Sequence, residues 1–279
     1  MTIDIICPLY NAEKYVEPLH ASLLMQEDVD LNSINYVLTR SKDKTEEILK
    51  KLGANYVQIE PSEFSHSASR EMMARKSTAD IIVFISQDVK ILRKDWLYFL
   101  TKDIAEGNCE AAYSRQLAEK NNIEKYTREK NYGGQSFIKT KADIESMGLN
   151  TFFFSDASSA INRKVFEELN YYDGKKFASN EDQYIAHKLI MEGYRIKYCA
   201  ESEVIHSHDF NFKSLYKRYQ DTGEFYRDEP YMNTYGTNSA GAGMAKYVLK
   251  RIIQDKNWAA AVEFIPNMAA RFLGMKIKK

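Results

Sequence analysis

The feature that most constrains the fold of this sequence is an apolar, β-branched run that ends at a carboxylate. Residues 81–85 are Ile-Ile-Val-Phe-Ile and lead through two polar residues to Asp88. A short run of this kind is typical of a strand buried on both faces of a parallel sheet. Open α/β sheets bind ligands where such strands end, so we expect Asp88 to lie at a ligand site. Residues 3–7 lead in the same way into Pro8-Leu9-Tyr10-Asn11, which predicts a nucleotide site between two strand ends.

Strand-like runs alternate with helical periodicity along the N-terminal part of the chain. This alternation predicts βαβ units and therefore an α/β fold with a mostly parallel sheet flanked by helices. A chain of 279 residues, 44% hydrophobic and 28% charged, can form one large domain of this class with an appendage. We expect strands at residues 3–7, 34–38, 55–59 and 81–86, and helices at residues 12–26, 43–52, 67–76 and 92–104.

The chain changes character after His208. We therefore predict a boundary near residue 209, between an α/β domain at 1–208 and a C-terminal helical region at 209–279. Residues 132–151 contain glycines and polar residues that interrupt the apolar periodicity of helices and strands. This predicts a mobile connection of the kind that forms a lid. The other expected elements are strands at 110–116, 195–199 and 203–206, helices at 117–132, 162–169, 179–193, 212–226 and 244–273, and a linker at 230–243.

Charge, cysteines and hydropathy limit the classes of partner and compartment. The chain carries 39 basic and 39 acidic residues, and this balance gives no reason to expect a nucleic-acid partner. Three widely spaced cysteines in apolar surroundings favour reduced core thiols and a cytoplasmic protein. The first predicted strand begins at residue 3 and leaves no room for a signal peptide, and no apolar run is long enough to span a membrane.

Asp88 is a candidate metal ligand. Mg²⁺ and Mn²⁺ commonly bind one or two protein carboxylates and complete their shells with substrate phosphates and water. Asp88 would then connect the protein to a diphosphate. The alternative is that Asp88 only caps a helix that begins near Leu92.

Two further groups of polar residues are candidates for the same site. Glu181 and Asp182 follow Ser179-Asn180 at a predicted helix start, where a carboxylate beside the crevice can act as a base for a sugar hydroxyl. The helix dipole lowers the pKa of such a base unless burial raises it again, and the alternative is that both residues serve only the dipole. His206 and His208 would point to one face of a strand, where an imidazole can complete a metal shell. The alternative for each histidine is a structural hydrogen bond.

Together and in this order, these motifs resemble the GT-A glycosyltransferases of family 2. The resemblance covers residues 3–226 and implies a Rossmann-like GT-A domain with a C-terminal helical extension. The matching segments are 8–11, Gln87-Asp88-Val89, Glu181-Asp182 and 204–208. A narrower similarity to bacterial rhamnosyltransferases that build surface polysaccharides rests on residues 85–88, 154–155, 159–161, 206–208 and 216–219.

The resemblance implies a role for each matching residue. Asp88 would bind Mg²⁺ or Mn²⁺, with Gln87-Asp88-Val89 in the place of the family's D-x-D element. Asp182 would deprotonate the acceptor hydroxyl, and Glu181 would orient the acceptor or the base. His206 and His208 would approach the metal or the diphosphate. The residues that would contact the nucleotide or the donor are Pro8, Tyr10, Asn11, Arg70, Gln87 and Asp88, and the alternative for Arg70 is an exposed helix arginine.

Two positions depart from the family pattern. Leu38 stands where the family has an aspartate that recognises the nucleotide base. Because a leucine side chain cannot accept a hydrogen bond, the backbone or another residue must recognise the base. Gln87 replaces the first carboxylate of the D-x-D element, which removes a negative charge and weakens the expected metal affinity. Arg40 and Lys42 are additions that would meet phosphate or, as we favour, remain solvated.

The C-terminal region predicts a contact surface. Residues 244–279 contain eight basic and two acidic residues, together with Trp258 and other large apolar side chains. Basic amphipathic helices bind anionic bilayers, and this location would suit a lipid-linked acceptor. The alternatives are a helical pair that docks on its own catalytic domain and one that contacts a second subunit in a homo-oligomer. Aromatic residues in 210–235 would equally line an acceptor groove.

The resemblance therefore implies an inverting, metal-assisted glycosyltransferase. Its donor would be dTDP-L-rhamnose and its acceptor a growing glycan linked to polyprenyl diphosphate at the inner face of the cell membrane. Leu38 leaves open a UDP-hexose or UDP-N-acetylhexosamine donor. A catalytically silent nucleotide- or glycan-binding module is the alternative from another class, but it has no physical need for both Asp88 and Asp182. A nucleotidyltransferase would need a Gly-rich, basic phosphate loop, and residues 7–13 contain neither glycine nor lysine.

Overall fold

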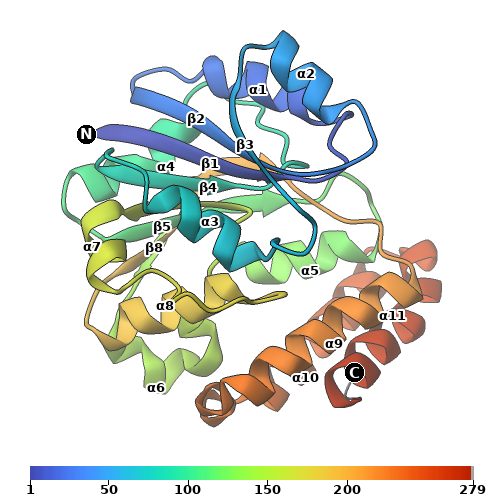
Figure 1. Cartoon of the computed structure of the whole chain (residues 1–279). Coiled ribbons are helices and arrows are strands. Elements are labelled where there is room, and N and C mark those ends of the chain that lie inside the picture. Colours follow the sequence, from blue (N-terminus) through green and yellow to red (C-terminus); the bar gives the residue numbers. More distant parts are fainter. Residues whose placement is uncertain (278–279) are drawn as a thin grey trace.

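A mixed β-sheet forms the centre of the molecule (Figure 1). The computed structural model describes residues 1–277, apart from the side chains of residues 238–240, so Lys278 and Lys279 of the predicted basic region lie outside the described residues. Within this range the sheet has eight strands in the order β3-β2-β1-β4-β7-β5-β8-β6. Their bounds are Thr2–Leu9 (β1), Asp30–Thr39 (β2), Asn55–Ile59 (β3), Ile81–Ile85 (β4), Ala111–Leu117 (β5), Phe137–Lys139 (β6), Ser158–Asn162 (β7) and Ile196–Ile205 (β8).

Most neighbouring strands run parallel. β1 pairs in parallel with β2 and β4, β2 with β3, and β5 with β8. β7 is antiparallel to both β4 and β5, and β6 is antiparallel to β8. Because β7 reverses the direction twice, β4 and β8 point the same way and their carboxyl ends lie on one edge of the sheet. The predicted α/β class with a mostly parallel sheet is confirmed.

Helices cover both faces of the sheet, because successive residues of each strand alternate between two apolar cores. Ile5 belongs to one core and Ile6 to the other. α1, α2 and α4 complete the first core, and α3, α7 and α8 complete the second. The helices are Val16–Leu24 (α1), Thr45–Lys51 (α2), His66–Ala74 (α3), Trp96–Ala105 (α4), Ile123–Asn131 (α5), Ile144–Met147 (α6), Arg163–Glu168 (α7), Glu181–Met191 (α8), Phe212–Asp228 (α9), Thr237–Gln254 (α10) and Trp258–Lys276 (α11).

The segment at 132–151 contains regular elements that the sequence did not predict, and its mobility and role as a lid stay predictions. It contains β6, α6 and two 3₁₀ turns, η1 (Lys141–Asp143) and η2 (Gly148–Phe152). Lys139 is fully buried, and its ammonium group donates to the carbonyl of Phe153. This long-range contact holds the segment in place, and the local glycines and polar residues gave no sign of it.

Two other elements differ from expectation. The strands predicted at 195–199 and 203–206 form the single strand β8, with a shift of register opposite β5. The strand continues through a polar stretch because Ser202 is buried and donates to the carbonyl of Trp96 at 3.1 Å. The linker predicted at 230–243 contains a 3₁₀ turn, η3 (Pro230–Tyr235), and the start of α10.

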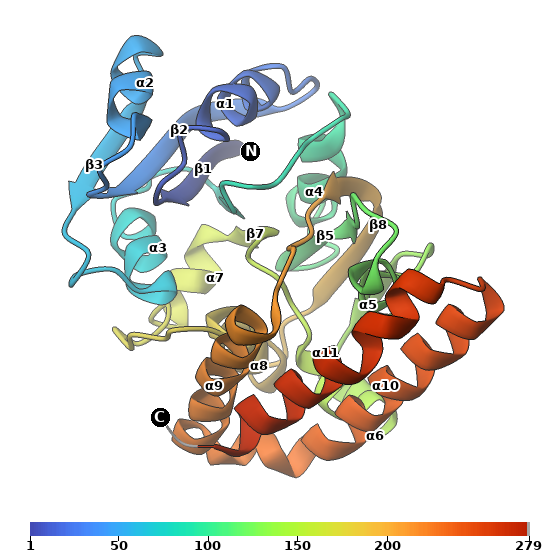
Figure 2. The ribbon, with the colours of Figure 1, turned by 90° about the vertical axis from the view of Figure 1, so that its right-hand side faces the viewer.

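The C-terminal region folds into helices that pack against the α/β part (Figure 2). α10 and α11 bury a small apolar cluster against Tyr126 of α5. α11 also approaches α9 so closely that a Cβ at Gly274 would lie 2.5 Å from the carbonyl oxygen of Tyr216. Among residues 1–277, no helix has the length and apolar character needed to cross a bilayer. The region therefore docks on its own chain through its inner faces, and a boundary near residue 209 stays a prediction.

Candidate active site

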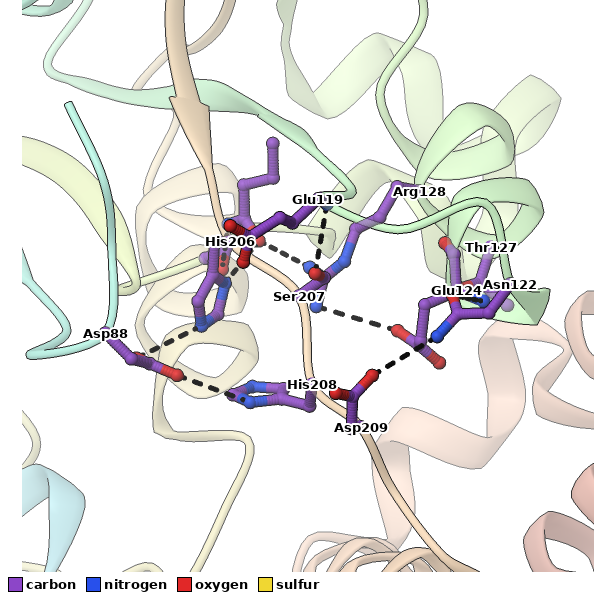
Figure 3. Close-up of polar contacts among 12 residues, drawn as sticks. Asp88, Glu119, Asn122, Glu124, Thr127, Arg128, His206, Ser207, His208 and Asp209 are labelled. Carbon is purple, nitrogen blue, oxygen red and sulfur yellow. Dashed lines mark hydrogen bonds and ion pairs between the residues drawn. The ribbon is translucent and has the colours of Figure 1, made fainter. Parts of the chain in front are cut away.

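Three side chains from two strand ends meet beside the sheet (Figure 3). Asp88 lies in the turn after β4, and His206 and His208 follow the end of β8. Mutual backbone hydrogen bonds between Lys90 and Ile205, at 2.9 and 3.0 Å, hold the two segments together. One ligand atom from each side chain lies within 4.8 Å of the other two. The structure thus brings together the three residues that the sequence singled out as metal ligands, which we call the metal cluster; metal binding itself stays a prediction.

The carboxylate of Asp88 contacts both imidazoles. Its Oδ1 lies 3.5 Å from Nε2 of His206, and its Oδ2 lies 3.4 Å from Nδ1 of His208. Asp88 does not cap the following helix, because α4 begins only at Trp96 and the residue before it is Asp95. The capping alternative is therefore wrong.

Gln116 of β5 fixes the ring of His206. Its Oε1 accepts a hydrogen bond from Arg128, and its amide nitrogen donates to Ser155 at 2.8 Å. Gln116 therefore presents an acceptor to Nδ1 of His206, 2.8 Å away, and we assign the ring proton to Nδ1. Nε2 of His206 then turns its lone pair toward the carboxylate of Asp88, an arrangement that a cation between them would satisfy: a metal ion at neutral pH, or a proton on Nε2 in acid.

The protonation states at neutral pH also suit a divalent metal. Burial lowers the pKa of both imidazoles, that of His208 to about 3. Burial alone would raise the pKa of Asp88, but its interactions with His206 and then His208 outweigh burial and lower the pKa to about 2. The cluster thus offers one carboxylate and two neutral imidazoles, with room in the shell for phosphate oxygens and water. These residues fit a divalent metal.

Gln87 fastens the loop that follows β1. Its Oε1 accepts from the backbone N–H of Tyr10 at 2.8 Å, and its Nε2 donates to the carbonyl of Tyr10 at 3.0 Å. A carboxylate at this position could make only the first of these bonds, which gives a structural reason for the departure from the D-x-D pattern. The loop exposes the ring of Tyr10 and turns at Asn11, whose φ is 49°. Nucleotide contacts from Pro8, Tyr10 and Asn11 stay predictions.

Asp43 joins the loops after β1 and β2, and the sequence analysis did not single it out. Its carboxylate accepts from the hydroxyls of Ser41 at 2.6 Å and Thr45 at 2.8 Å, and from the backbone N–H of Glu13 at 3.0 Å. Thr45 accepts in turn from the N–H of Ala12 at 2.8 Å. The Ser-x-Asp-x-Thr spacing was the signal that could have found this connection, because short polar side chains bond to the backbone of tight turns.

The other departures from the family pattern also have structural reasons. Leu38 is buried in the core, so its side chain offers nothing to a nucleotide base. Arg40 forms an exposed ion pair with Glu60 at 2.7 Å, and Lys42 is exposed. Solvation, the favoured interpretation for both cations, agrees with this placement.

Arg70 and Glu181 form a buried ion pair at the start of α8. Their side chains are 3% and 8% exposed, and Nη1 of Arg70 lies 2.8 Å from Oε1 of Glu181. Arg70 also donates to the carbonyl of Asp156 at 3.3 Å and lies over the ring of Phe84. Removing either partner of such a pair leaves an uncompensated buried charge. Arg70 is therefore not an exposed helix arginine, and its contact with a donor stays a prediction.

Asp182 lies beside this ion pair and has an unusually high proton affinity. Burial raises its pKa well above the usual range, and the carboxylates of Glu181 and Asp156 add to the effect. Asp156, which the sequence analysis missed, is buried and accepts from the hydroxyls of Tyr172 and Ser159 at 2.7 Å each. We call Asp156, Glu181 and Asp182 the carboxylate cluster. The dipole of α8 lowers the pKa of Asp182 and burial raises it. The effect of burial is the larger one, and the raised pKa makes Asp182 a stronger base.

α8 begins at Glu181, at the predicted helix start, and no described side chain caps it. Asn180 adopts a left-handed conformation with φ of 65°, and its side chain donates to Gln183 at 3.2 Å instead of capping the helix. The backbone N–H of Gln183 donates to Oδ1 of Asp182 at 2.8 Å. This bond orients Asp182, a residue that keeps partial exposure to solvent.

Several side chains act electrostatically on, or are acted on by, residues of both clusters. Arg218 of α9 lowers the pKa of His208 and of His66, in each case after the larger effect of burial, and Glu181 of the carboxylate cluster acts on His66 in the opposite direction. Burial raises the pKa of Tyr132, on which both Arg128 and Asp182 also act. The two clusters therefore share charged neighbours on both sides.

A cavity of about 470 Å³ opens beside the metal cluster. It lies between the segment that begins at His208 and the C-terminal helices, with Phe210 and Phe212 on one side and Pro266 and Asn267 on the other. Apolar walls with a few polar groups are typical of small-ligand sites. The cavity is thus a candidate acceptor site that includes part of the aromatic segment singled out from the sequence.

Comparison with known sequences agrees with the resemblance. The family described as Glycosyl transferase family 2 matches residues 4–170. The O-antigen chain rhamnosyltransferase RfbN of Salmonella typhimurium is 30% identical over 100% of this chain and 90% of its own length. The O-antigen chain rhamnosyltransferase WbaN of Salmonella anatum is also 30% identical, over 100% of this chain and 89% of its own length.

Solved structures show the same fold. The mannosyltransferase PcManGT of Pyrobaculum calidifontis, determined with GDP-Man and Mn²⁺, has a TM-score of 0.65 at 15% identity and covers 98% of this chain and 85% of its own. TarS of S. aureus, determined with UDP-GlcNAc, has a TM-score of 0.58 at 15% identity and covers 98% of this chain and 91% of its own. The predicted GT-A architecture is confirmed.

Proposed function

The chain belongs to glycosyl transferase family 2 and is a glycosyltransferase, and on this premise we propose that it transfers L-rhamnose from dTDP-L-rhamnose to a growing O-antigen-type glycan, with inversion at the anomeric carbon. The observation that carries the proposal is the pairing of two opposite carboxylate environments in one region, Asp88 among imidazoles and Asp182 among carboxylates. The similarity to two O-antigen rhamnosyltransferases over the full chain supports the choice of sugar.

Asp182 takes the proton from the acceptor hydroxyl. A general base works best when its pKa lies near the working pH, and burial moves the pKa of Asp182 in that direction. Its Oδ1 is held by the N–H of Gln183, and the ion pair between Arg70 and Glu181 fixes the first turn of α8. Glu181 thus positions the base rather than taking the proton itself. The activated oxygen attacks the anomeric carbon from the face opposite the nucleotide, which inverts that centre.

Asp88, His206 and His208 would hold the metal. When bound there, a divalent ion supplies positive charge that stabilises the diphosphate leaving group. Two imidazole ligands favour Mn²⁺ over Mg²⁺, since Mg²⁺ prefers oxygen ligands. Arg218, which acts electrostatically on His208, would add a fixed positive charge on the same side.

The enzyme would recognise the nucleotide base of the donor without a carboxylate at residue 38, which is leucine. The loop of Pro8, Tyr10 and Asn11, fastened by Gln87, offers backbone groups and an exposed aromatic ring for this purpose. A UDP-hexose or UDP-N-acetylhexosamine donor is the second candidate, because Leu38 favours neither thymine nor uracil. A catalytically silent binding module would need neither the lowered pKa of Asp88 nor the raised pKa of Asp182.

The acceptor would be a glycan carried on polyprenyl diphosphate, and the cavity beside His208, which Asp182 does not line, would bind a part of it away from the reacting hydroxyl. We place the enzyme in the cytoplasm, peripheral on the inner face of the cell membrane. A homo-oligomer stays a prediction, and the described residues of a single copy form both clusters.

A donor panel tests the proposal. The full chain would be mixed with Mn²⁺, a synthetic lipid-linked acceptor, and dTDP-L-rhamnose, UDP-glucose, UDP-N-acetylglucosamine or GDP-mannose in turn, and nucleoside diphosphate release would be measured. We expect acceptor-dependent release with dTDP-L-rhamnose at a rate at least about tenfold above the others, as a site matched to one donor gives. The Asp182→Ala and Asp88→Ala variants should release nucleoside diphosphate at least about 10²-fold more slowly. Faster release from a UDP-sugar would replace the donor, and no release from any donor would favour the binding module.

A further inference from the structure

α11 turns its small residues toward the protein and its large apolar residues toward solvent. Ala260, Ala270 and Gly274 are buried. The exposed residues recur at helical spacing along one side, and we call that side the outer face of α11. It consists of Trp258, Val262, Ile265 and Phe272, whose exposed fractions are 74%, 79%, 74% and 63%. A helix on the surface of a globular protein normally shows the opposite arrangement.

The charged residues in the body of α11 are engaged with the protein. Arg271 donates to Glu124 of α5 at 3.2 Å. Glu263 accepts from the backbone N–H of Ile123 at 3.3 Å. Both charges are therefore directed toward α5, and the outer face remains apolar from its first residue to Phe272. Such a continuous exposed apolar strip marks an interaction site.

Basic residues border the outer face. Lys256 precedes it, Lys276 follows it, and Lys250 lies on the neighbouring helix α10 beside the exposed Ile253. All three lysines are exposed, and none forms an ion pair with another residue of the described chain. A second copy would bring a like-charged border against this one, whereas an anionic surface would complement it.

We propose that the outer face of α11 docks the enzyme on an anionic lipid bilayer. An amphipathic helix of this kind lies in the interface, with its apolar face among the acyl chains and its cations at the headgroups. Trp258 would anchor the helix start, as tryptophan does at membrane interfaces. Pro266 and Asn267 of the same helix line the cavity beside His208, so docking would bring that cavity close to the bilayer. The inference deepens the proposed function and rests on its lipid-linked acceptor.

Vesicle binding of the full chain tests the inference without any catalytic step. We expect the protein to sediment with phosphatidylglycerol-rich vesicles and at least about tenfold less with pure phosphatidylcholine vesicles. The triple variant Val262→Ser, Ile265→Ser, Phe272→Ser should lose at least about tenfold in binding, because several buried apolar side chains are removed. The triple variant Lys250→Gln, Lys256→Gln, Lys276→Gln should lose the preference for anionic lipid. Leu24→Ser, at a residue of α1 that is 62% exposed, is the matched control and should bind normally.

Tryptophan emission gives a second measurement. The chain has two tryptophans, of which Trp96 is fully buried and Trp258 is exposed. Vesicles should therefore shift the emission of Trp258 to the blue and leave Trp96 unaffected. Trp258→Phe should still bind vesicles but lose the shift.

The outcomes separate this inference from the proposed function. Absence of binding to both kinds of vesicle, or serine variants that bind normally, would overturn the docking face even if rhamnose transfer were observed. A dimer in light scattering that the serine variants dissolve would assign the face to a second copy instead. Vesicle binding by the Asp182→Asn variant would confirm docking independently of transfer. Normal thermal unfolding of every variant would exclude a folding defect.

Discussion

The metal cluster and the carboxylate cluster hold the same chemical group in opposite electrostatic settings. Burial acts to raise the pKa of both Asp88 and Asp182. Imidazoles beside Asp88 reverse this effect and lower its pKa to about 2, whereas neighbouring carboxylates reinforce it at Asp182. A carboxylate that stays ionised suits a cation, and one that accepts a proton readily suits a base. The neighbouring side chains, rather than the degree of burial, therefore set the different pKa values of Asp88 and Asp182. These values suit one carboxylate to metal binding and the other to proton transfer.

The sharpest test of this division is Asp182→Asn. Asparagine keeps the shape of the side chain but cannot accept the acceptor proton, so we expect transfer to fall by about 10²–10⁴-fold, the range for a general base. The affinity for Mn²⁺, measured by calorimetry, should stay within a few-fold of the original, because the metal cluster is intact. Transfer within tenfold of the original chain would remove Asp182 from the role of base.

Asp88→Asn should impair the metal cluster. Losing the only carboxylate of the metal cluster should weaken Mn²⁺ binding and lower transfer by about 10²–10³-fold, as for loss of one group that stabilises developing charge. Unlike Asp182→Asn, this variant should recover part of its rate at high Mn²⁺, because mass action compensates for weaker binding. Unchanged Mn²⁺ affinity would show that the metal binds elsewhere.

The sequence predicted the clusters unequally, and the reason is physical. Asp88 follows a strand whose apolar run reveals both its type and its end, so its place at the sheet edge could be inferred. Glu181 and Asp182 stand at a helix start that local chemistry marks, although Asn180 does not cap it as expected. The mixed sheet could be predicted only in part, because the antiparallel insertion of β7 depends on long-range pairing that no local pattern encodes.

The residues that tune the clusters were not predicted for the same reason. Gln116 lies near the end of β5, and only the meeting of β5, α5 and the segment after β8 shows that its acceptor faces His206. Asp156 lies in a turn before β7, and its effect on Asp182 depends on the fold. Such residues carry no motif of their own, since their role exists only in three dimensions.

Gln116→Leu tests the tuning of the metal cluster. Leucine removes the acceptor that holds the Nδ1 proton of His206, so the ring can turn or change tautomer, and Mn²⁺ affinity should fall by about 10–100-fold, as is typical for partners of metal ligands. Gln116→Glu is the matched control: it keeps an acceptor for His206 and a partner for Arg128, so it should bind Mn²⁺ within a few-fold of the original. Equal losses in both variants would contradict the assignment of the tautomer.

The smallest expected effect is on stability, and its sign distinguishes the clusters. The pKa of Asp182 is raised in the folded protein, so its contribution to stability is present below its ordinary pKa of 3.8 and is lost as pH rises through the folded value. Asp182→Asn should therefore stabilise the metal-free protein near neutral pH, by about 1 kcal/mol, as is typical when a strained functional group is removed. The gain should vanish near pH 4.

The same substitution at Asp88 should act in the opposite direction. The pKa of Asp88 is about 2 in the folded protein, so its contribution is present above 3.8 and is lost as pH falls toward 2. Relative to the original chain, Asp88→Asn should accordingly be less stable at neutral pH than in acid, which is the reverse of Asp182→Asn. Urea unfolding of both variants, in chelator and at neutral and acid pH, gives the two free-energy differences directly. The same direction of change with pH in both variants would mean that burial, and not the neighbouring side chains, sets the proton affinity of both carboxylates.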